Sequence, residues 1–262
     1  MKIRVLGCHG SDQALGQDVG SRPCRTCGFL LNDTVMVDAG TIGSALTLQE
    51  QKRIKHVLLS HLHFDHIQGL PTFADNLIDD VDEPVVISAT RDVLDGLQTH
   101  IFNDTVYPNF LQLPQPHRPV FTCRTLEAGK PSEVAGLHVT AIQVNHLVPT
   151  VGFLIREGSV SILYSGDTFE TDEIWALAGR ESALKAALIE TSFPDEMADV
   201  AAVSRHLTPS MLAKEFRKIG RPDLPVYVYH LKPRLHAVIE RQLRNLEIEN
   251  LVILEEGQEI VI

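Results

Sequence analysis

Short apolar runs alternate with turn residues and helix-like segments along the first half of the chain. Strands are predicted at residues 4–6, 28–31, 34–37, 56–60 and 84–88, where apolar and β-branched residues cluster. Asn32-Asp33 is a turn signal between two of these strands. Helices are predicted at 43–52 and at 91–101, where Val93, Leu94, Leu97 and Ile101 recur at helical spacing. The pattern is typical of an α/β fold.

The second half repeats this order of strand, loop and helix. Strands are predicted at residues 137–144, 152–155, 161–164, 187–189 and 224–229. A helix is expected over 210–218, with Thr208 as its amino-terminal cap and Pro209 at its first position. His206 and Thr208 would then lie at the positive end of a helix, a natural place for a phosphate group.

The chain has 262 residues, of which 44% are hydrophobic, so it can bury a large core. No linker, repeat or low-complexity tract divides it, and we expect a single domain over 1–262. The amino terminus begins a strand at once and has no apolar run that would make a signal peptide or membrane span. We therefore expect a cytoplasmic protein with no membrane partner.

The formal net charge is −11. Proteins that bind RNA or DNA usually neutralise phosphates with a basic surface, which this composition does not favour. A small anion held by metal ions needs no such surface. The charge therefore favours a nucleotide or metabolite substrate over a polymeric nucleic acid.

The strand ending at Ser60 is followed at once by His61-Leu62-His63-Phe64-Asp65-His66. In an extended segment His61 and His63 point to the same side, so both can bind one cation. Asp65 and His66 follow where residues 67–70 can begin a helical turn, which directs them to a neighbouring position. Histidine and aspartate together suit zinc or a similar first-row ion. The loop predicts half of a two-metal hydrolytic site.

The remaining ligands are expected at the carboxyl ends of other strands, where a sheet presents side chains to a crevice. His146, Asp167 and His230 each follow an apolar run in this way. They are the candidates that complete the two-metal site.

Cys8, His9, Cys24 and Cys27 lie in the amino-terminal region. Four cysteines in a chain of this length do not indicate a secreted disulfide scaffold. Cys24 and Cys27 form a CxxC pair that either belongs to a small structural zinc site or consists of reduced thiols near a loop. The sequence leaves these two interpretations open.

Asp38, the His61 to His66 loop, His146, Asp167 and His230 resemble the ordered motifs of the metallo-β-lactamase fold superfamily. The resemblance implies an αββα sandwich of two mixed sheets flanked by helices. It implies further that the first metal is held by His61, His63 and His146, the second by Asp65, His66 and His230, and that Asp167 bridges them. Two divalent ions are expected, zinc before manganese or iron.

More particular motifs resemble class II 3',5'-cyclic-nucleotide phosphodiesterases. They are His100-Ile101-Phe102-Asn103, Tyr107-Pro108-Asn109, Ile189-Glu190-Thr191-Ser192-Phe193, His206-Leu207-Thr208-Pro209 and His230-Leu231-Lys232-Pro233. Tyr107 and Arg205 depart from the family, which commonly has Trp and a small residue there. The resemblance implies hydrolysis of cAMP or cGMP to the 5'-monophosphate through a metal-bridging hydroxide.

Within this mechanism we interpret Asp65, His206 and Glu190 as catalytic residues. His206 is the candidate for contact with the phosphate and for protonation of the leaving group, with Glu190 orienting it. Substrate contacts are assigned to His206, Thr208, Asn103 and Lys232.

Two alternatives remain open. One is a tRNA 3'-processing or other phosphodiesterase of the same fold, which the acidic charge disfavours. The other is a metal-binding sensor without turnover, which the complete ligand set disfavours. The expected partner is a small cyclic nucleotide, and a homodimer is neither required nor excluded.

Overall fold

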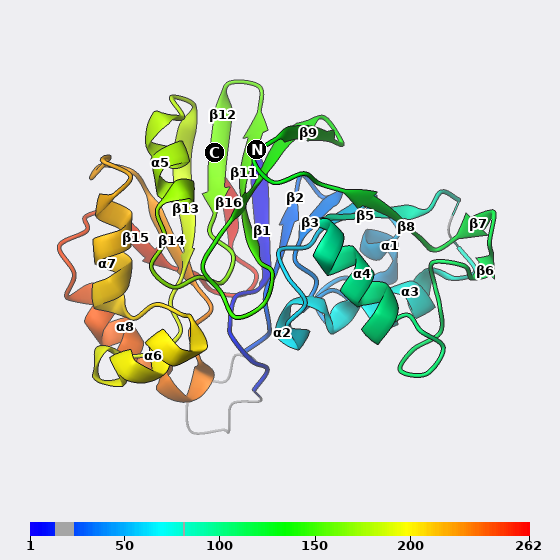
Figure 1. Cartoon of the computed structure of the whole chain (residues 1–262), viewed down its shortest axis with the longest axis horizontal. Helices are drawn as coiled ribbons and strands as arrows, with labels where there is room; N and C mark the ends of the chain where they lie inside the picture. The colour runs from blue at the N-terminus through cyan, green and yellow to red at the C-terminus, as the bar shows by residue number, and fades with distance from the viewer. Residues whose placement is uncertain (14–23, 81) are drawn as a thin grey trace.

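Two mixed sheets of seven strands each form the centre of the molecule in the computed structural model (Figure 1). The structure describes residues 1–13, 24–80 and 82–262. The first sheet has the order β16 (Glu259–Val261), β1 (Lys2–Gly7), β2 (Gly28–Leu31), β3 (Val35–Val37), β4 (His56–Leu58), β5 (Val85–Ala89) and β8 (Phe121–Thr125). The second has the order β15 (Leu251–Ile253), β14 (Val226–Tyr229), β13 (Leu184–Glu190), β12 (Val160–Tyr164), β11 (Val151–Glu157), β10 (Leu137–Gln143) and β9 (Pro131–Val134).

Helices cover the outer faces of both sheets (Figure 1). Beside the first sheet lie α1 (Leu48–Gln51), α2 (Phe64–Ile67), α3 (Gly69–Leu77) and α4 (Arg91–His100). Beside the second lie α5 (Glu173–Arg180), α6 (Ala198–Ser204), α7 (Pro209–Arg217) and α8 (His236–Arg244). Short 3-10 turns occupy Asp195–Met197 and Pro233–Leu235, and β6 (Pro114–Gln115) pairs with β7 (Arg118–Pro119). The predicted αββα sandwich is confirmed.

The core between the sheets is apolar and rich in aromatic side chains. Tyr164 stacks on Tyr229 with ring centroids 5.1 Å apart, and Phe29 meets both rings edge-on. All three are buried. Burial of each such side chain contributes about 1.5–3 kcal/mol, so this contact holds the two sheets together.

Two helix predictions were wrong in their boundaries. The helix expected over 43–52 begins only at Leu48, because Thr47 and Glu50 form a capping box that stops it from extending further back. The helical turn expected after Ile67 begins already at Phe64, with His63 as its extended first flanking residue. Asp65 and His66 therefore lie inside α2, not before it.

Loops after several strands meet at one edge of the paired sheets. Strands β12, β13 and β14 are parallel neighbours, so the residues that follow them, including Asp167 and His230, emerge side by side. The loop after β4 reaches this edge from the other sheet, since Val151 donates a backbone hydrogen bond to Ser60. Within the described ranges, no helix is long and apolar enough to cross a membrane.

Candidate metal centre

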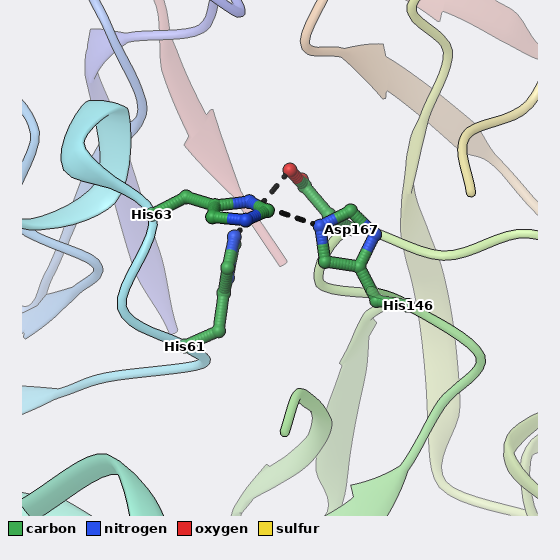
Figure 2. A group of neighbouring side chains, drawn as sticks. All are labelled: His61, His63, His146 and Asp167. Carbon is green, nitrogen blue, oxygen red and sulfur yellow. Dashed lines mark hydrogen bonds and ion pairs between the residues drawn. The ribbon is translucent and has the colours of Figure 1, made fainter. Parts of the chain in front are cut away.

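The first group of ligand atoms joins both sheets. His61, His63, His146 and Asp167 place their ligand atoms within 4.8 Å of one another (Figure 2). His146 Nε2 lies 3.0 Å from His63 Nδ1, and His61 Nε2 lies 3.6 Å from Asp167 Oδ2. These donors converge on one point, as the ligands of a single ion would.

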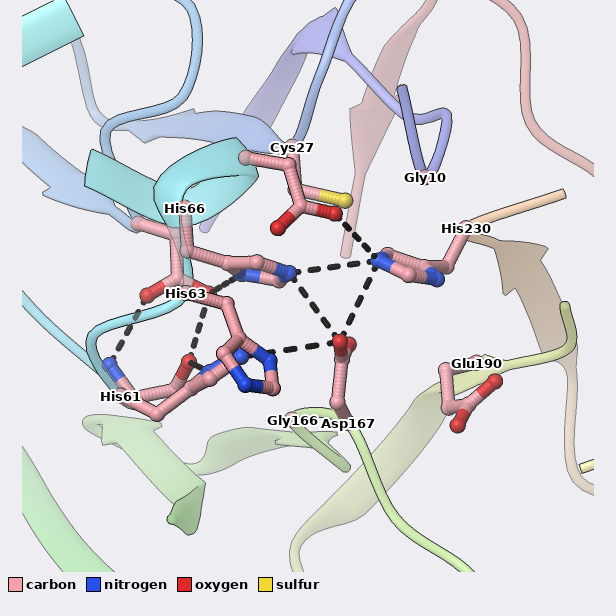
Figure 3. Close-up of polar contacts among 12 residues, drawn as sticks. Gly10, Cys27, His61, His63, His66, Gly166, Asp167, Glu190 and His230 are labelled. Carbon is pink, nitrogen blue, oxygen red and sulfur yellow. Dashed lines mark hydrogen bonds and ion pairs between the residues drawn. The ribbon is translucent and has the colours of Figure 1, made fainter. Parts of the chain in front are cut away.

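A second group lies on the other side of Asp167. The Nε2 atoms of His66 and His230 are 3.3 Å apart, and Asp167 Oδ2 lies 3.3 Å and 3.2 Å from them (Figure 3). Asp65 Oδ2 lies 3.2 Å from His230 Nε2. The structure thus brings all the predicted ligand residues together, with Asp167 between the two groups.

Unpartnered buried atoms test whether these residues suit a metal. His61 Nε2 and both carboxylate oxygens of Asp167 are buried without a hydrogen-bond partner. An unpartnered buried carboxylate is costly in a protein unless it is hydrogen-bonded or coordinates a metal. The histidine and aspartate donors fit divalent metal ions of the zinc type. A bound ion would account for the unpartnered atoms.

Asp38 contacts His66 directly and His61 through Ser60. Its carboxylate accepts hydrogen bonds from the backbone and hydroxyl of Ser60 at 2.8 Å, from Tyr164 at 2.6 Å and from His66 Nδ1 at 2.7 Å. Ser60 Oγ also lies 2.9 Å from His61 Nδ1. Such contacts fix the tautomer and ring orientation of ligating histidines.

The other histidines are held in the same manner. His146 Nδ1 donates to the carbonyl of Arg205 at 2.9 Å, and His230 Nδ1 lies 2.7 Å from Ser192 Oγ. Arg205 adopts a left-handed conformation at the end of α6 that directs its carbonyl toward His146. Sequence reasoning gave no role to Ser192. Its place two residues after β13 is the signal that identifies it.

The titration of the centre follows from burial and from neighbouring charges. Burial lowers the pKa of His61 well below its usual value, and the neighbouring histidines add to this. Burial also lowers the pKa of His146, to about 4. His66 is equally buried, but Asp167 and Asp38 outweigh that effect and raise its pKa. Neutral imidazole at His61 and His146 is the form that binds a metal.

His206 lies beside both ligand groups. Its ring centroid is 5.0 Å from that of His146 and 5.2 Å from that of His230. His206 Nδ1 lies 2.8 Å from Glu190 Oε1, which is fully buried. Burial raises the pKa of Glu190 and Asp167 raises it further, while burial lowers the pKa of His206. The pair can hold a proton next to the ligands.

The other predicted substrate residues differ in position. Lys232 Nζ donates to the Gly10 carbonyl at 2.6 Å, beside His230. Thr208 is buried and its hydroxyl caps α7 through Met211 N. Asn103 uses its side chain for the backbone groups of Thr99, Thr105 and Val106. Only His206 and Lys232 are thus placed at the ligand groups by a described contact.

The cysteines of the amino-terminal region divide between two places. Cys8 and His9 lie with Glu256, whose carboxylate is 2.7 Å from His9 Nδ1. Cys27 lies instead with His66 and His230. Burial raises the pKa of Cys8 and of Cys27, so both are neutral thiols when no metal is bound.

Known proteins are similar to this chain over most of its length. A family model described as a beta-lactamase superfamily domain matches residues 33–259. A probable 3',5'-cyclic-nucleotide phosphodiesterase of Yersinia pestis is 29% identical over 70% of this chain and 58% of its own length. A 3',5'-cyclic-nucleotide phosphodiesterase of Aliivibrio fischeri is 26% identical over 87% of this chain and 85% of its own. The chain thus spans little more than half of the first relative.

Among solved structures, that of unliganded yeast PDE1 superposes with a TM-score of 0.79. It covers 98% of each chain at 20% sequence identity. This likeness establishes the fold, and the ligand groups described above lie on that fold.

Proposed function

We propose that this chain, which belongs to the metallo-β-lactamase superfamily, is a metal-dependent phosphodiesterase that hydrolyses 3',5'-cyclic nucleotides to 5'-monophosphates. The family model confirms the predicted superfamily. The relatives of Yersinia pestis and Aliivibrio fischeri favour this substrate class. The whole of residues 1–262 is proposed to form one hydrolase domain.

The observation that carries the proposal is the pairing of His206 with Glu190 beside the ligand groups. Hydrolysis of a cyclic phosphodiester expels an alkoxide, which is a poor leaving group and needs a proton. His206 is held by Glu190 at 2.8 Å and lies against His146 and His230. A proton donor in this place suits a phosphodiester with an alkoxide leaving group.

Two divalent ions, zinc in our proposal, would be held by His61, His63 and His146 on one side and by Asp65, His66 and His230 on the other, with Asp167 shared. Bound together, such ions neutralise phosphate charge and lower the pKa of a water molecule to near 7. Asp65 would act in catalysis as a ligand. His206 would donate the proton to the departing 3'-oxygen, and Glu190 would fix the ring for that transfer.

Lys232 would add positive charge near the phosphate, since it lies beside Gly10 and His230. We also propose phosphate contacts from Thr208 and Asn103: the Thr208 hydroxyl accepts from Met211 N and keeps its own proton to donate, and Asn103 Oδ1 accepts from Thr105 N. The substrate is proposed to be a small nucleotide because the net charge of −11 opposes polymeric nucleic acid.

A direct assay tests the proposal. Purified protein loaded with zinc is incubated with cAMP, cGMP and 2',3'-cyclic nucleotides, and the products are separated by chromatography. We expect 5'-AMP or 5'-GMP, and no product from an Asp167→Asn variant. If the protein hydrolyses neither cAMP nor cGMP, the substrate assignment is wrong. Cleavage of precursor tRNA would favour the alternative nuclease, and failure on bis(p-nitrophenyl) phosphate would favour a sensor.

A further inference from the structure

Cys27 adds a sulfur atom to the second ligand group. Its Sγ lies within 4.8 Å of the ligating nitrogens of His66 and His230, and all three residues are buried. Figure 3 shows the sulfur directed toward the space between the two rings, on the side opposite Asp167. The chain therefore places a thiol where the proposed second metal ion would bind.

The unpartnered carboxylate of Asp167 points independently to a ligand at this place. Its Oδ2 atom lies 3.2 Å and 3.3 Å from the same two ring nitrogens and has no hydrogen-bond partner. Cys27 and Asp167 thus enclose one position from opposite sides. A thiol in such surroundings is a candidate ligand and not simply a packed core residue.

The backbone keeps Cys27 in this position. Its carbonyl accepts a hydrogen bond from Gly40 N at 2.8 Å, and Gly28, the next residue, is paired with Gly7. The thiol itself reaches the His9 carbonyl only at 3.6 Å. Since this contact is long and weak, little is lost when the sulfur turns toward an ion.

We propose that the Cys27 thiolate is a ligand of the second metal ion, together with His66 and His230. Zinc binds sulfur at about 2.3 Å and nitrogen at about 2.0–2.1 Å, so two ligand atoms of one ion lie at most roughly 4.4 Å apart. The Cys27 Sγ atom lies within 4.8 Å of both ring nitrogens, close to this limit. The thiol proton passes to solvent on binding. A soft thiolate directs this position toward zinc and away from magnesium or manganese.

Cobalt spectroscopy tests the ligand without relying on activity. Metal-free protein is titrated with Co²⁺ while the near-ultraviolet absorption is recorded, because thiolate-bound cobalt gives an intense charge-transfer band. We expect the band in the wild type and in Cys123→Ser, whose thiol is exposed on β8, and its loss in Cys27→Ser. Competition with a chelator should show that Cys27→Ser weakens one zinc equivalent roughly 10- to 100-fold.

A band that persists in Cys27→Ser would place the sulfur ligand at Cys8 or Cys24 and overturn the proposal. X-ray absorption of the zinc-loaded wild type supplies a measurement that needs no variant: a sulfur neighbour at about 2.3 Å supports the proposal, and only nitrogen and oxygen neighbours contradict it. The inference rests on the proposed metal centre but not on its substrate. A sulfur signal in a protein that does not hydrolyse cyclic nucleotides would contradict the proposed function but not the Cys27 ligand.

Discussion

The carboxylate of Asp38, which follows β3, lies 2.7 Å from Nδ1 of His66 in helix α2. The contact is fully buried, and Tyr164 and Ser60 donate to the same carboxylate. Asp38 thus accepts the hydrogen bond from Nδ1 of His66, which leaves the Nε2 atom of that ring available to a metal. Partners of this kind orient histidines that bind metals.

The first prediction concerns this contact. Asp38→Asn replaces one acceptor oxygen by an amide that cannot accept from His66, Ser60 and Tyr164 together. Asparagine tolerates the left-handed backbone at this position, where φ is 54°, so the backbone need not change. We expect the affinity for zinc to fall about 10- to 100-fold, measured by chelator competition. Asp33→Asn, with φ 59°, is the matched control, and an equal loss there would contradict the assignment.

A second prediction follows from the close approach of Gly10 to the centre. Gly10 lies near His230 (Figure 3). A Cβ atom at Gly10 would lie 2.8 Å from Cε1 of His230 and 2.9 Å from Nζ of Lys232. Lysine can move aside, but His230 is held by Ser192. Gly10→Ala should therefore tilt His230 and release one of two zinc ions on dialysis, measured by elemental analysis. Gly43→Ala is the control, since its Cβ would meet nothing closer than 3.5 Å. Full retention of zinc would refute this.

Part of the fold and of the centre was predictable from the sequence. The buried strand β2 carries a continuous apolar run, and His61, His63 and Asp65 lie shortly after β4, so local pattern was enough. Likewise Thr208 was correctly expected to cap α7.

Contacts between distant segments were not predictable in this way. Cys27 meets His230 only because β2 and β14 belong to different sheets that converge at one edge. Ser192 joins His230 to Glu190 through hydrogen bonds of a hydroxyl, which leaves no periodic trace in the sequence. The helix boundary at Thr47 depended on a capping pair that outweighed the helical preference of the residues before it.

The third prediction concerns acid stability at the capping box. Backbone and side-chain hydrogen bonds from Thr47, with help from Arg4, lower the pKa of Glu50 from 4.5 to about 2. Because the folded value lies below the unfolded one, the charged carboxylate stabilises the fold above about pH 4.5, and the gain disappears as pH falls toward 2. Glu50→Gln should thus lower the free energy of unfolding by up to about 1 kcal/mol at neutral pH, since the pair is partly exposed.

Urea unfolding of metal-free protein measures this difference. The deficit of Glu50→Gln should shrink when the same experiment is done at about pH 3, where the wild-type carboxylate begins to take up its proton. Glu249→Gln, at an exposed carboxylate, should show no such change with pH. A deficit of equal size at both pH values would mean that packing and not charge is responsible.

The last prediction separates proton transfer from metal binding at His206. His206→Asn removes the ring that lies 2.8 Å from Glu190 but leaves the predicted ligands in place. On cAMP we expect kcat to fall about 10²- to 10⁴-fold while the zinc content is kept, because the 3'-alkoxide then leaves without a proton. On bis(p-nitrophenyl) phosphate, whose leaving group needs no proton, the loss should be much smaller. His138→Asn, at an exposed histidine of β10, should behave as wild type with both substrates. Equal losses on both would instead make His206 a positioning residue for His146, whose ring it contacts. The ratio of the two losses therefore decides which role His206 has.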